Sequence, residues 1–160
     1  MGGSTPHPVG ANGGRVLLFP ARRSPHRDGH EDGGGHDSAT GVFGGRKILV
    51  VEDDFIVAFD MQSMLEEQGA EVIGPASSLQ EARALLAGAP PDAAVLDVNL
   101  NGEYVFPLAE DLRARGIPFL FATAYADDDR LFPPIAKDVL RLAKPVLPAV
   151  LIGQLKRILP

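Results

Sequence analysis

The chain contains no cysteine, so it forms no disulfide bond and has no thiolate for catalysis or metal binding. It also lacks any apolar run close to the roughly 20 residues needed to span a bilayer. Its first residues do not combine a basic stretch with an apolar one, and they predict no signal peptide. Disulfide-stabilised and membrane-spanning classes of protein are therefore not expected, and the cytoplasm is the expected compartment.

Positive charge is in short supply as well. The chain has 15 Lys and Arg residues against 21 Asp and Glu residues, which leaves a net charge of −6. Proteins that bind nucleic acids normally carry a basic face, so we expect no nucleic-acid partner, and we expect no membrane partner either. At 160 residues, the chain has room for one domain of ordinary size with its own core.

Residues 1–46 differ from the rest of the chain in composition. They hold 12 of the 18 glycines and all four histidines, and they show neither helical nor strand periodicity. A segment with so little apolar surface to bury is predicted to be a disordered tail. Two alternatives stay open: a docking peptide at Arg15-Val-Leu-Leu-Phe-Pro-Ala-Arg-Arg23, and a loose metal site. The metal site would use side chains of ligand type, namely His26, His30, Asp32, His36 and Asp37.

From residue 47 onward, short apolar runs alternate with amphipathic stretches. The runs predict five buried strands, at residues 47–51, 71–75, 93–96, 119–122 and 139–143. The stretches predict four helices, whose apolar faces are marked by Val57, Met61, Met64 and Leu65, by Leu79, Ala82, Leu85 and Leu86, by Val105, Leu108, Ala109 and Leu112, and by Leu151, Leu155, Ile158 and Leu159. Ser78 and Glu81 predict a capping box at the second helix.

Such alternation is typical of a parallel sheet with helices on both faces. Between the fourth and fifth strands, however, Pro133 and Pro134 stand where a helix would run, and proline inside a helix costs about 3 kcal/mol. We predict a short or mobile segment there. Because parallel sheets bind ligands at the carboxyl ends of their strands, we look for a site at that edge.

Polar side chains follow four of the five predicted strands at the points where these strands end. They are Glu52, Asp53 and Asp54 after the first strand, Asp97 and Asn99 after the third, Thr123 after the fourth and Lys144 after the fifth. Clustered carboxylates repel one another unless a cation lies among them, and oxygen ligands without nearby His or Cys favour Mg²⁺. A carboxylate beside Mg²⁺ can attack a phosphoryl group, whose transition-state charge a hydroxyl and an ammonium group stabilise.

Four segments then resemble the signature segments of response-regulator receiver domains. They are Ile48-Leu-Val-Val-Glu-Asp53, Val95-Leu-Asp-Val98, Ala122-Thr-Ala124 and Ala143-Lys-Pro145, in the family's order and at fitting intervals. The likeness covers roughly residues 46–159. It implies a flavodoxin-like, doubly wound α/β domain over residues 47–160, with a parallel five-stranded sheet in the order 2-1-3-4-5.

The resemblance also implies roles for the strand-end residues. Mg²⁺ would be held by Asp53 directly, by Glu52 largely through water, by Asp97 and by the backbone carbonyl of Asn99. The family's acidic pair maps onto Glu52 and Asp53, which leaves Asp54 without a clear role.

For the reaction itself, the resemblance implies that Asp97 accepts the phosphoryl group. Thr123 would donate its hydroxyl to that group, and Lys144 would pair with it electrostatically. We predict that the segment around Pro133 and Pro134 orders on phosphorylation or on contact with a partner. The peptide bond before Pro145 is predicted to be cis, as is common in the family.

By the same resemblance, a sensor histidine kinase supplies the phosphoryl group. The output is contact with a downstream regulator protein or draining of phosphoryl groups from the kinase. No segment follows the last predicted helix, which makes a stand-alone receiver the expectation, and histidine is absent after His36, so the domain is not itself a histidine phosphodonor. Such a protein is a signalling protein rather than an enzyme, because it catalyses only its own phosphoryl transfer and autodephosphorylation.

Residues 116–125 are also similar to the alphaproteobacterial single-domain regulators named for a Phe-Ala-Thr-Gly-hydrophobic-Tyr motif. Ala124 stands where that motif has Gly, and Tyr125 comes one residue early. A second departure concerns the aromatic residue that receivers commonly carry three positions before the Lys, because this chain has Arg141 there. Tyr125 is a candidate to replace it.

Two other functions remain open. Haloacid-dehalogenase-like phosphatases also use a strand-end Asp and Mg²⁺, but they need a second Asp two residues later, where this chain has Asn99. The other alternative is a receiver fold that serves as a scaffold without accepting phosphate, which the intact set of Asp53, Asp97, Thr123 and Lys144 disfavours.

Overall fold

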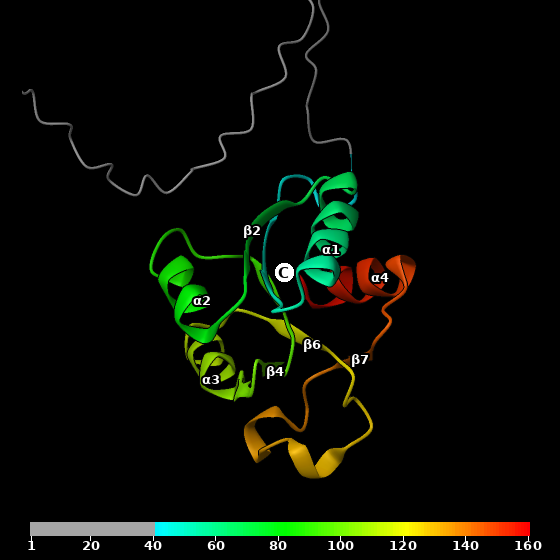
Figure 1. Cartoon of the computed structure of the whole chain (residues 1–160). Helices are drawn as coiled ribbons and strands as arrows, with labels where there is room; N and C mark the ends of the chain where they lie inside the picture. The colour runs from blue at the N-terminus through cyan, green and yellow to red at the C-terminus, as the bar shows by residue number, and fades with distance from the viewer. Residues whose placement is uncertain (1–40) are drawn as a thin grey trace, which may run out of the picture. The chain divides into compact units, whose positions relative to one another are not determined.

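The computed structural model describes residues 41–160, in which strands and helices alternate along the chain (Figure 1). Five parallel strands form the central sheet: β1 (Lys47–Val51), β2 (Glu71–Ala76), β3 (Ala93–Leu96), β6 (Phe119–Thr123) and β7 (Arg141–Ala143). Their order across the sheet is β2-β1-β3-β6-β7. Counted along these five strands, the order is 2-1-3-4-5, so the predicted fold class and strand order are confirmed.

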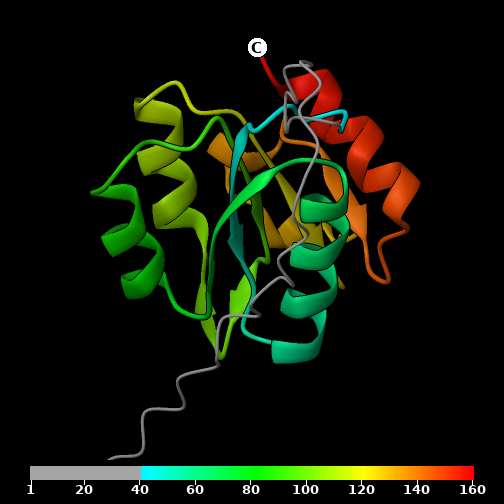
Figure 2. The ribbon, with the colours of Figure 1, turned by 90° about the horizontal axis from the view of Figure 1, so that it is seen from above.

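Helices cover both faces of the sheet. They are α1 (Phe55–Glu67), α2 (Leu79–Leu86), α3 (Phe106–Ala114) and α4 (Pro148–Ile158). Figures 1 and 2 show α1 and α4 on one face and α2 and α3 on the other. This is the three-layer arrangement that the alternating pattern predicts.

The sheet separates two apolar clusters, because successive side chains of a strand point to opposite faces. In β1, Leu49 and Val51 pack into the cluster that includes residues of α2 and α3, whereas Ile48 and Val50 pack into the cluster that includes residues of α1 and α4. All four side chains are at most 1% exposed. Burying a side chain of this size stabilises the fold by about 1.5–3 kcal/mol. Burial on both faces explains why residues 48–51 of β1 form an unbroken apolar run rather than an alternating pattern.

The acidic run after β1 sets the start of α1. The Asp54 carboxylate accepts hydrogen bonds from the backbone N–H groups of Ile56 (2.9 Å) and Val57 (3.1 Å). A side-chain oxygen in this position caps two N–H groups that have no partner within the helix. Asp54, which had no clear role in the sequence, is therefore the N-cap of α1.

The predicted capping box of α2 forms only in part. The Ser78 hydroxyl accepts a hydrogen bond from the backbone N–H of Glu81 (3.1 Å), as predicted. The Glu81 carboxylate, however, accepts from the N–H (2.9 Å) and hydroxyl (3.0 Å) of Ser77 rather than from Ser78. Ser77 therefore takes the reciprocal half of the box.

Two local features differ from the sequence prediction or were missed by it. Strands β4 (Asn99–Leu100) and β5 (Glu103–Tyr104) form a short antiparallel hairpin after β3. With two residues each, they are too short to leave a periodic signal. The last strand was predicted to begin at residue 139 but begins at Arg141.

The connection between β6 and β7 contains no α-helix in the structure. It holds two 3₁₀ turns, η1 (Asp129–Leu131) and η2 (Pro134–Ala136), which agrees with the predicted short segment. Pro134 begins the second turn, where its missing N–H leaves no helical partner unsatisfied. The ordering of this segment on phosphorylation stays a prediction.

Residues 41–46, which the sequence analysis assigned to the tail, form turns that pack with the domain. Phe43 is 3% exposed and belongs to the cluster beneath α1 and α4. Its N–H donates to the carbonyl of Gln68 (3.0 Å), and the N–H of Gly45 donates to that of Gly69 (2.7 Å). Residues 1–40, with the predicted docking peptide and the loose metal site, lie outside the described residues.

Strand β2 is irregular beside the end of β1. Its register with β1 runs from Lys47 opposite Glu71 to Leu49 opposite Ile73 and then shifts, so that Val51 lies opposite Ala76. Gly74 lies within this shift and has φ +96°, a conformation that side chains disfavour. The peptide bonds before Pro75 and Pro145 are both cis, which agrees with the prediction for Pro145.

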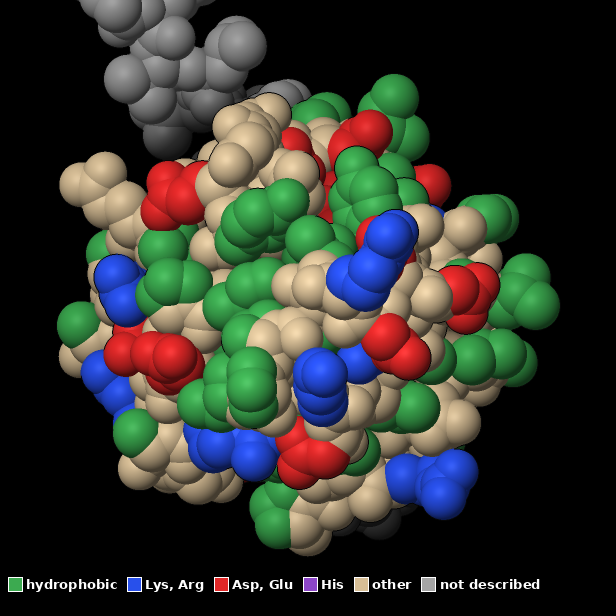
Figure 3. Space-filling model, turned by 90° about the horizontal axis from the view of Figure 1, so that it is seen from below, with side chains coloured by type: hydrophobic (Ala, Val, Ile, Leu, Met, Phe, Trp, Pro, Cys, Tyr) green, Lys and Arg blue, Asp and Glu red, His purple; other side chains and the backbone are tan. Residues whose placement is uncertain are grey.

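Among residues 41–160, no helix combines the length and apolar character that crossing a membrane requires. Figure 3 shows one face of the molecule, on which hydrophobic side chains lie among interspersed acidic and basic ones. Neither sign of charge gathers into a large patch on that face.

Candidate functional site

The strand-end residues meet at one edge of the sheet, as the parallel topology requires. Glu52 and Asp53 follow β1, and Asp97 follows β3. Thr123 is the last residue of β6, and Lys144 follows β7. These four strands are neighbours in the sheet, so their carboxyl ends lie side by side.

Three carboxylates form the centre of the site. Glu52, Asp53 and Asp97 each offer one oxygen, and these oxygens lie within 4.8 Å of one another. Glu52 is 3% exposed and Asp97 is 8% exposed, while Asp53 is half-buried. Oxygen ligands of this kind, with no His or Cys beside them, fit Mg²⁺.

Lys144 reaches across the site from β7 to the carboxylates. Its Nζ lies 2.5 Å from an oxygen of Glu52 and 3.2 Å from Oδ2 of Asp97. The contact with Glu52 is a hydrogen bond that the ammonium group donates. One positive charge therefore faces three carboxylates, which leaves an excess of negative charge.

Burial shifts the pKa of the two buried carboxyl groups upward. The pKa of Glu52 is raised to about 7. Loss of water contributes most to this rise and the charge of Asp97 adds to it, whereas the hydrogen bond and charge of Lys144 oppose it. Burial likewise raises the pKa of Asp97 against the opposing effect of Lys144. For Lys144, burial alone would lower the pKa, but the hydrogen bond to Glu52 and the charges of both carboxylates outweigh it, so its pKa is raised.

Backbone contacts fix the positions of the carboxylates. Oδ1 of Asp97 accepts from the N–H of Val98 (2.7 Å), and Oδ2 of Asp53 accepts from the N–H of Asn101 (3.0 Å). Oε1 of Glu52 accepts from the N–H of Asp54 (3.1 Å), and the N–H of Glu52 donates to the carbonyl of Ala76 (2.9 Å). The irregular end of β2 thus helps to place Glu52.

The carboxylates open onto a surface depression of about 380 Å³. Its lining comprises Glu52, Asp53, Asp54, Asp97, Asn99, Asn101, Ala124, Tyr125 and Lys144. Asn99 therefore lies at the site, and its side-chain oxygen accepts from the N–H of Gly102 (2.7 Å) within the β4–β5 turn.

Asn101 was not singled out in the sequence. It sits in the same turn with φ +52°, a left-handed conformation that Asn tolerates better than most residues. The pair Asn101-Gly102 is itself a turn signal that could have revealed this hairpin.

Thr123 is placed differently from the other predicted residues. It is fully buried and does not line the depression. Its Oγ1 accepts a hydrogen bond from the N–H of Tyr125 (3.1 Å). The next two residues, Ala124 and Tyr125, do line the depression, and Tyr125 is 48% exposed.

A three-layer α/β fold with a buried Asp, an acidic pair and a Lys at the strand ends defines a class of signalling domain, and the chain belongs to it. Residues 48–155 match the family described as the response regulator receiver domain. The chain is thus a receiver domain of two-component signalling.

Among known proteins, the chain is similar to the transcriptional regulatory protein PdtaR of Mycobacterium tuberculosis. The two are 31% identical over 85 residues, which cover 52% of this chain and 42% of PdtaR. The chain therefore spans about two fifths of the length of that curated relative.

Solved structures of other proteins match a larger share of the chain. SdrG from Sphingomonas melonis is 34% identical, with a TM-score of 0.62, over 71% of this chain and 96% of that one. The response regulator PhyR from Brucella abortus is 26% identical, with a TM-score of 0.62, over 72% of this chain and 48% of that one. These similarities agree with the family assignment.

Proposed function

We propose that Asp97 accepts a phosphoryl group from a sensor histidine kinase in a reaction that requires Mg²⁺. The observation that carries this proposal is the position of Asp97 within the acidic cluster. It is a buried carboxylate that opens onto the depression, and Lys144 lies 3.2 Å away. Glu52 and Asp53 supply the neighbouring oxygens within 4.8 Å.

In this proposal, Glu52, Asp53, Asp97 and the backbone carbonyl of Asn99 hold the metal. When bound, Mg²⁺ would offset the excess negative charge of the three carboxylates and favour the ionised form of Asp97. The carboxylate of Asp97 then attacks phosphorus and forms an oxygen–phosphorus bond. The bond from phosphorus to the nitrogen of the donor imidazole breaks, and that nitrogen takes up a proton from solvent.

Lys144 has two parts in the proposed reaction. Before transfer, its ammonium group offsets the charges of Glu52 and Asp97. As transfer proceeds, negative charge spreads over the phosphoryl oxygens, and the same ammonium group stabilises it from across the site. Thr123 would donate its hydroxyl to these oxygens, while its Oγ1 accepts a hydrogen bond from the N–H of Tyr125 in this structure.

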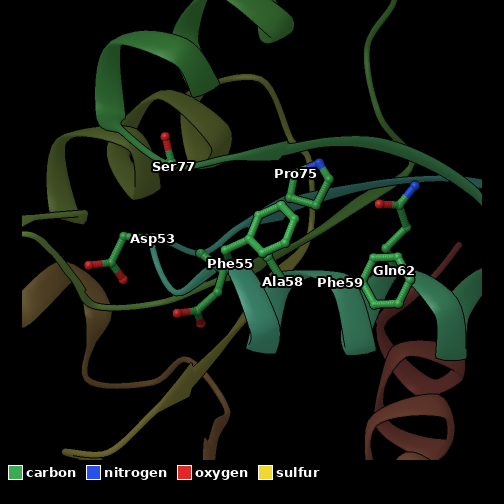
Figure 4. Close-up of a pocket in the computed structure, with 8 residues that line it drawn as sticks. Asp53, Phe55, Ala58, Phe59, Gln62, Pro75 and Ser77 are labelled. Carbon is green, nitrogen blue, oxygen red and sulfur yellow. The ribbon is translucent and has the colours of Figure 1, made fainter. Parts of the chain in front are cut away.

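A protein donor needs a surface on which to dock, and α1 presents one beside the acidic cluster. Phe55, Ile56 and Phe59 are 82%, 72% and 60% exposed. Phe55 and Phe59 line a hollow that also contains Asp53, with Pro75 and Ser77 across from them (Figure 4). Exposed aromatic residues beside the acceptor support contact with a protein partner.

The output is proposed to be contact with a downstream regulator protein or removal of phosphoryl groups from the kinase. What supports this is the family membership of the chain, since receiver domains serve two-component signalling. Both outputs depend on the phosphoryl group at Asp97, so the test of the acceptor comes first.

Intact mass after incubation with acetyl phosphate and Mg²⁺ tests the acceptor. We expect the wild type to gain one phosphoryl group and the Asp97→Asn variant to gain none. Asp60→Asn, which removes an exposed carboxylate of α1, is the matched control and should be labelled like the wild type. The Phe55→Ser variant should label normally with acetyl phosphate but more slowly from a cognate kinase.

Three results would count against the proposal. Labelling of Asp97→Asn would move the acceptor to another residue. No labelling of the wild type by acetyl phosphate or by candidate kinases would favour a scaffold that works without phosphate. Equal rates from the kinase for Phe55→Ser and wild type would remove α1 from the docking surface.

A further inference from the structure

Arg141 begins β7 and ties the connection between β6 and β7 to the sheet. Its Nη1 lies 2.6 Å from Oδ1 of Asp129 and donates to the carbonyl of Ala126 (3.3 Å). The centre of its guanidinium group lies 3.7 Å from the centroid of the Phe132 ring. With three partners, the side chain is only 11% exposed.

The contact of Arg141 with the Phe132 ring connects its contacts with the loop to the apolar core. Phe132 is 2% exposed, and its ring packs against Phe106 (5.7 Å between centroids) and Phe121 (5.5 Å). A guanidinium group over an aromatic face is held by the ring's charge distribution as well as by packing. Arg141 therefore covers an outer face of a buried aromatic cluster while it holds an exposed carboxylate on its other side.

The segment that Arg141 holds begins at the phosphoryl-acceptor site. Ala124 and Tyr125 line the depression over Asp97, and the next residue, Ala126, is bound to Arg141 through its carbonyl. The N–H of Tyr125 donates to Thr123 Oγ1, which links that hydroxyl to the turn after β6. If the Thr123 side chain moves toward a phosphoryl group on Asp97, either the turn after β6 moves with it or this hydrogen bond is lost. The bond from Arg141 to Ala126 opposes movement of the turn.

We propose that Arg141 is a positioning residue that clamps residues 126–132 and thereby controls how readily the Thr123 hydroxyl reaches the phosphoryl group. The inference rests on the proposed function and names the regulation of the same site. In this scheme, phosphorylation of Asp97 shifts the turn and weakens the clamp. Residues 126–132 should then become less protected, which is the opposite of the ordering predicted from the two prolines alone.

Hydrogen exchange across residues 126–132 and the rate of labelling by acetyl phosphate test the proposal together. In Arg141→Gln, exchange in this segment should be about tenfold faster than in the wild type before any phosphorylation. The maximal labelling rate should rise about threefold, with little change in the acetyl phosphate concentration at half-maximal rate. Arg141→Lys keeps the charge but not the planar group. Its exchange rate and maximal labelling rate should lie between those of the wild type and of Arg141→Gln.

Arg130→Gln is the matched control. Arg130 lies in the same segment and pairs with Asp128 at 3.1 Å, but its side chain is 93% exposed and the pair lies within the loop. This variant should exchange and label like the wild type. If Arg141→Gln fails to fold, Asp129→Asn breaks the exposed arm of the clamp without touching the core. That variant should then show faster exchange in residues 126–132 and a higher maximal labelling rate, both by smaller factors than Arg141→Gln.

The two proposals fail in different ways. Absence of labelling in the wild type overturns the proposed function, whatever Arg141 does. Normal labelling of the wild type, together with unchanged exchange and an unchanged maximal rate in both Arg141→Gln and Asp129→Asn, overturns the clamp alone. Greater protection of residues 126–132 after labelling of the wild type would also overturn it, in favour of ordering.

Discussion

The side of the site formed by the ends of β1 and β3 and the side formed by the ends of β6 and β7 hold their residues by different means. On the first side, backbone N–H groups of neighbouring residues bind the carboxylates of Glu52, Asp53 and Asp97. On the second side, the N–H of Lys144 donates to the carbonyl of Thr123 (3.0 Å), but the connection after β6 is held to the sheet by the side chain of Arg141.

This difference suggests that the two sides of the site have different roles in the reaction. The N–H groups of Asp54 and Val98 belong to the backbone just after buried strands, so we expect the first side to keep Glu52 and Asp97 in place through the reaction cycle. Side-chain contacts to an exposed loop can break and reform at modest cost, so the second side is suited to change. Lys144 links the two, because it follows β7 and binds residues after β1 and β3.

We expect the largest effect on the rate of labelling when the ammonium group of Lys144 is removed. In Lys144→Met, the charge that offsets Glu52 and Asp97 and that faces the phosphoryl oxygens is gone. We expect labelling by acetyl phosphate to slow by about 10²–10³-fold, as for loss of one group that stabilises transition-state charge. Lys137→Met removes an exposed lysine from the connection before β7 and should leave the rate unchanged. A rate for Lys144→Met within about threefold of wild type would contradict the role proposed for this residue.

A second prediction concerns a substitution that disturbs only the first side of the site. A Cβ atom at Gly74 would lie 2.7 Å from the N of Ala76 and 2.9 Å from the carbonyl oxygen of Val50, at a φ of +96°. Gly74→Ala should therefore lower the free energy of unfolding by about 3 kcal/mol in urea titrations. Gly102→Ala is the control, because Gly102 has a φ of +89° but a Cβ atom there would meet nothing within 4 Å. This substitution should lower the free energy of unfolding by about 1 kcal/mol. Equal losses in the two variants would show that close backbone contact at Gly74 is unimportant.

A third and smaller effect concerns the pH dependence of stability without metal. The pKa of Glu52 in the folded protein is about 7, above its ordinary value of 4.5. A carboxyl group whose pKa rises on folding stabilises the fold below its unfolded pKa and loses that contribution as the pH rises through the folded pKa. With EDTA present, the free energy of unfolding should therefore fall by about 2 kcal/mol between pH 5 and pH 8.

Two comparisons sharpen this pH prediction. Glu52→Gln has no carboxyl group to titrate, so its stability should change less over the same pH range. Addition of Mg²⁺ at pH 8 should restore stability to the wild type, because bound metal favours the ionised carboxylates. A metal-free wild type that is equally stable at pH 5 and pH 8 would argue against the raised pKa.

Much of the fold could be read from the sequence because its signals are local and regular. The three inner strands, β1, β3 and β6, are apolar runs because both faces of the sheet are covered there, and each α-helix repeats its apolar residues on one face. The β4–β5 hairpin was missed because two-residue strands leave no period. Phe43 was assigned to the tail because its glycine-rich neighbours hide one buried aromatic residue.

Which chemical groups come to the edge of the sheet can be read from the sequence, because residues at the ends of parallel strands must meet there. Carboxylates after β1 and β3, a hydroxyl at the end of β6 and an ammonium group after β7 follow from order and spacing alone. How these groups are held depends on the folded chain. The tertiary structure made Asp54 the cap of α1, turned the Thr123 hydroxyl toward the N–H of Tyr125, and laid Arg141 on Phe132. Such contacts join side chains across turns, and no periodic pattern in a sequence records them.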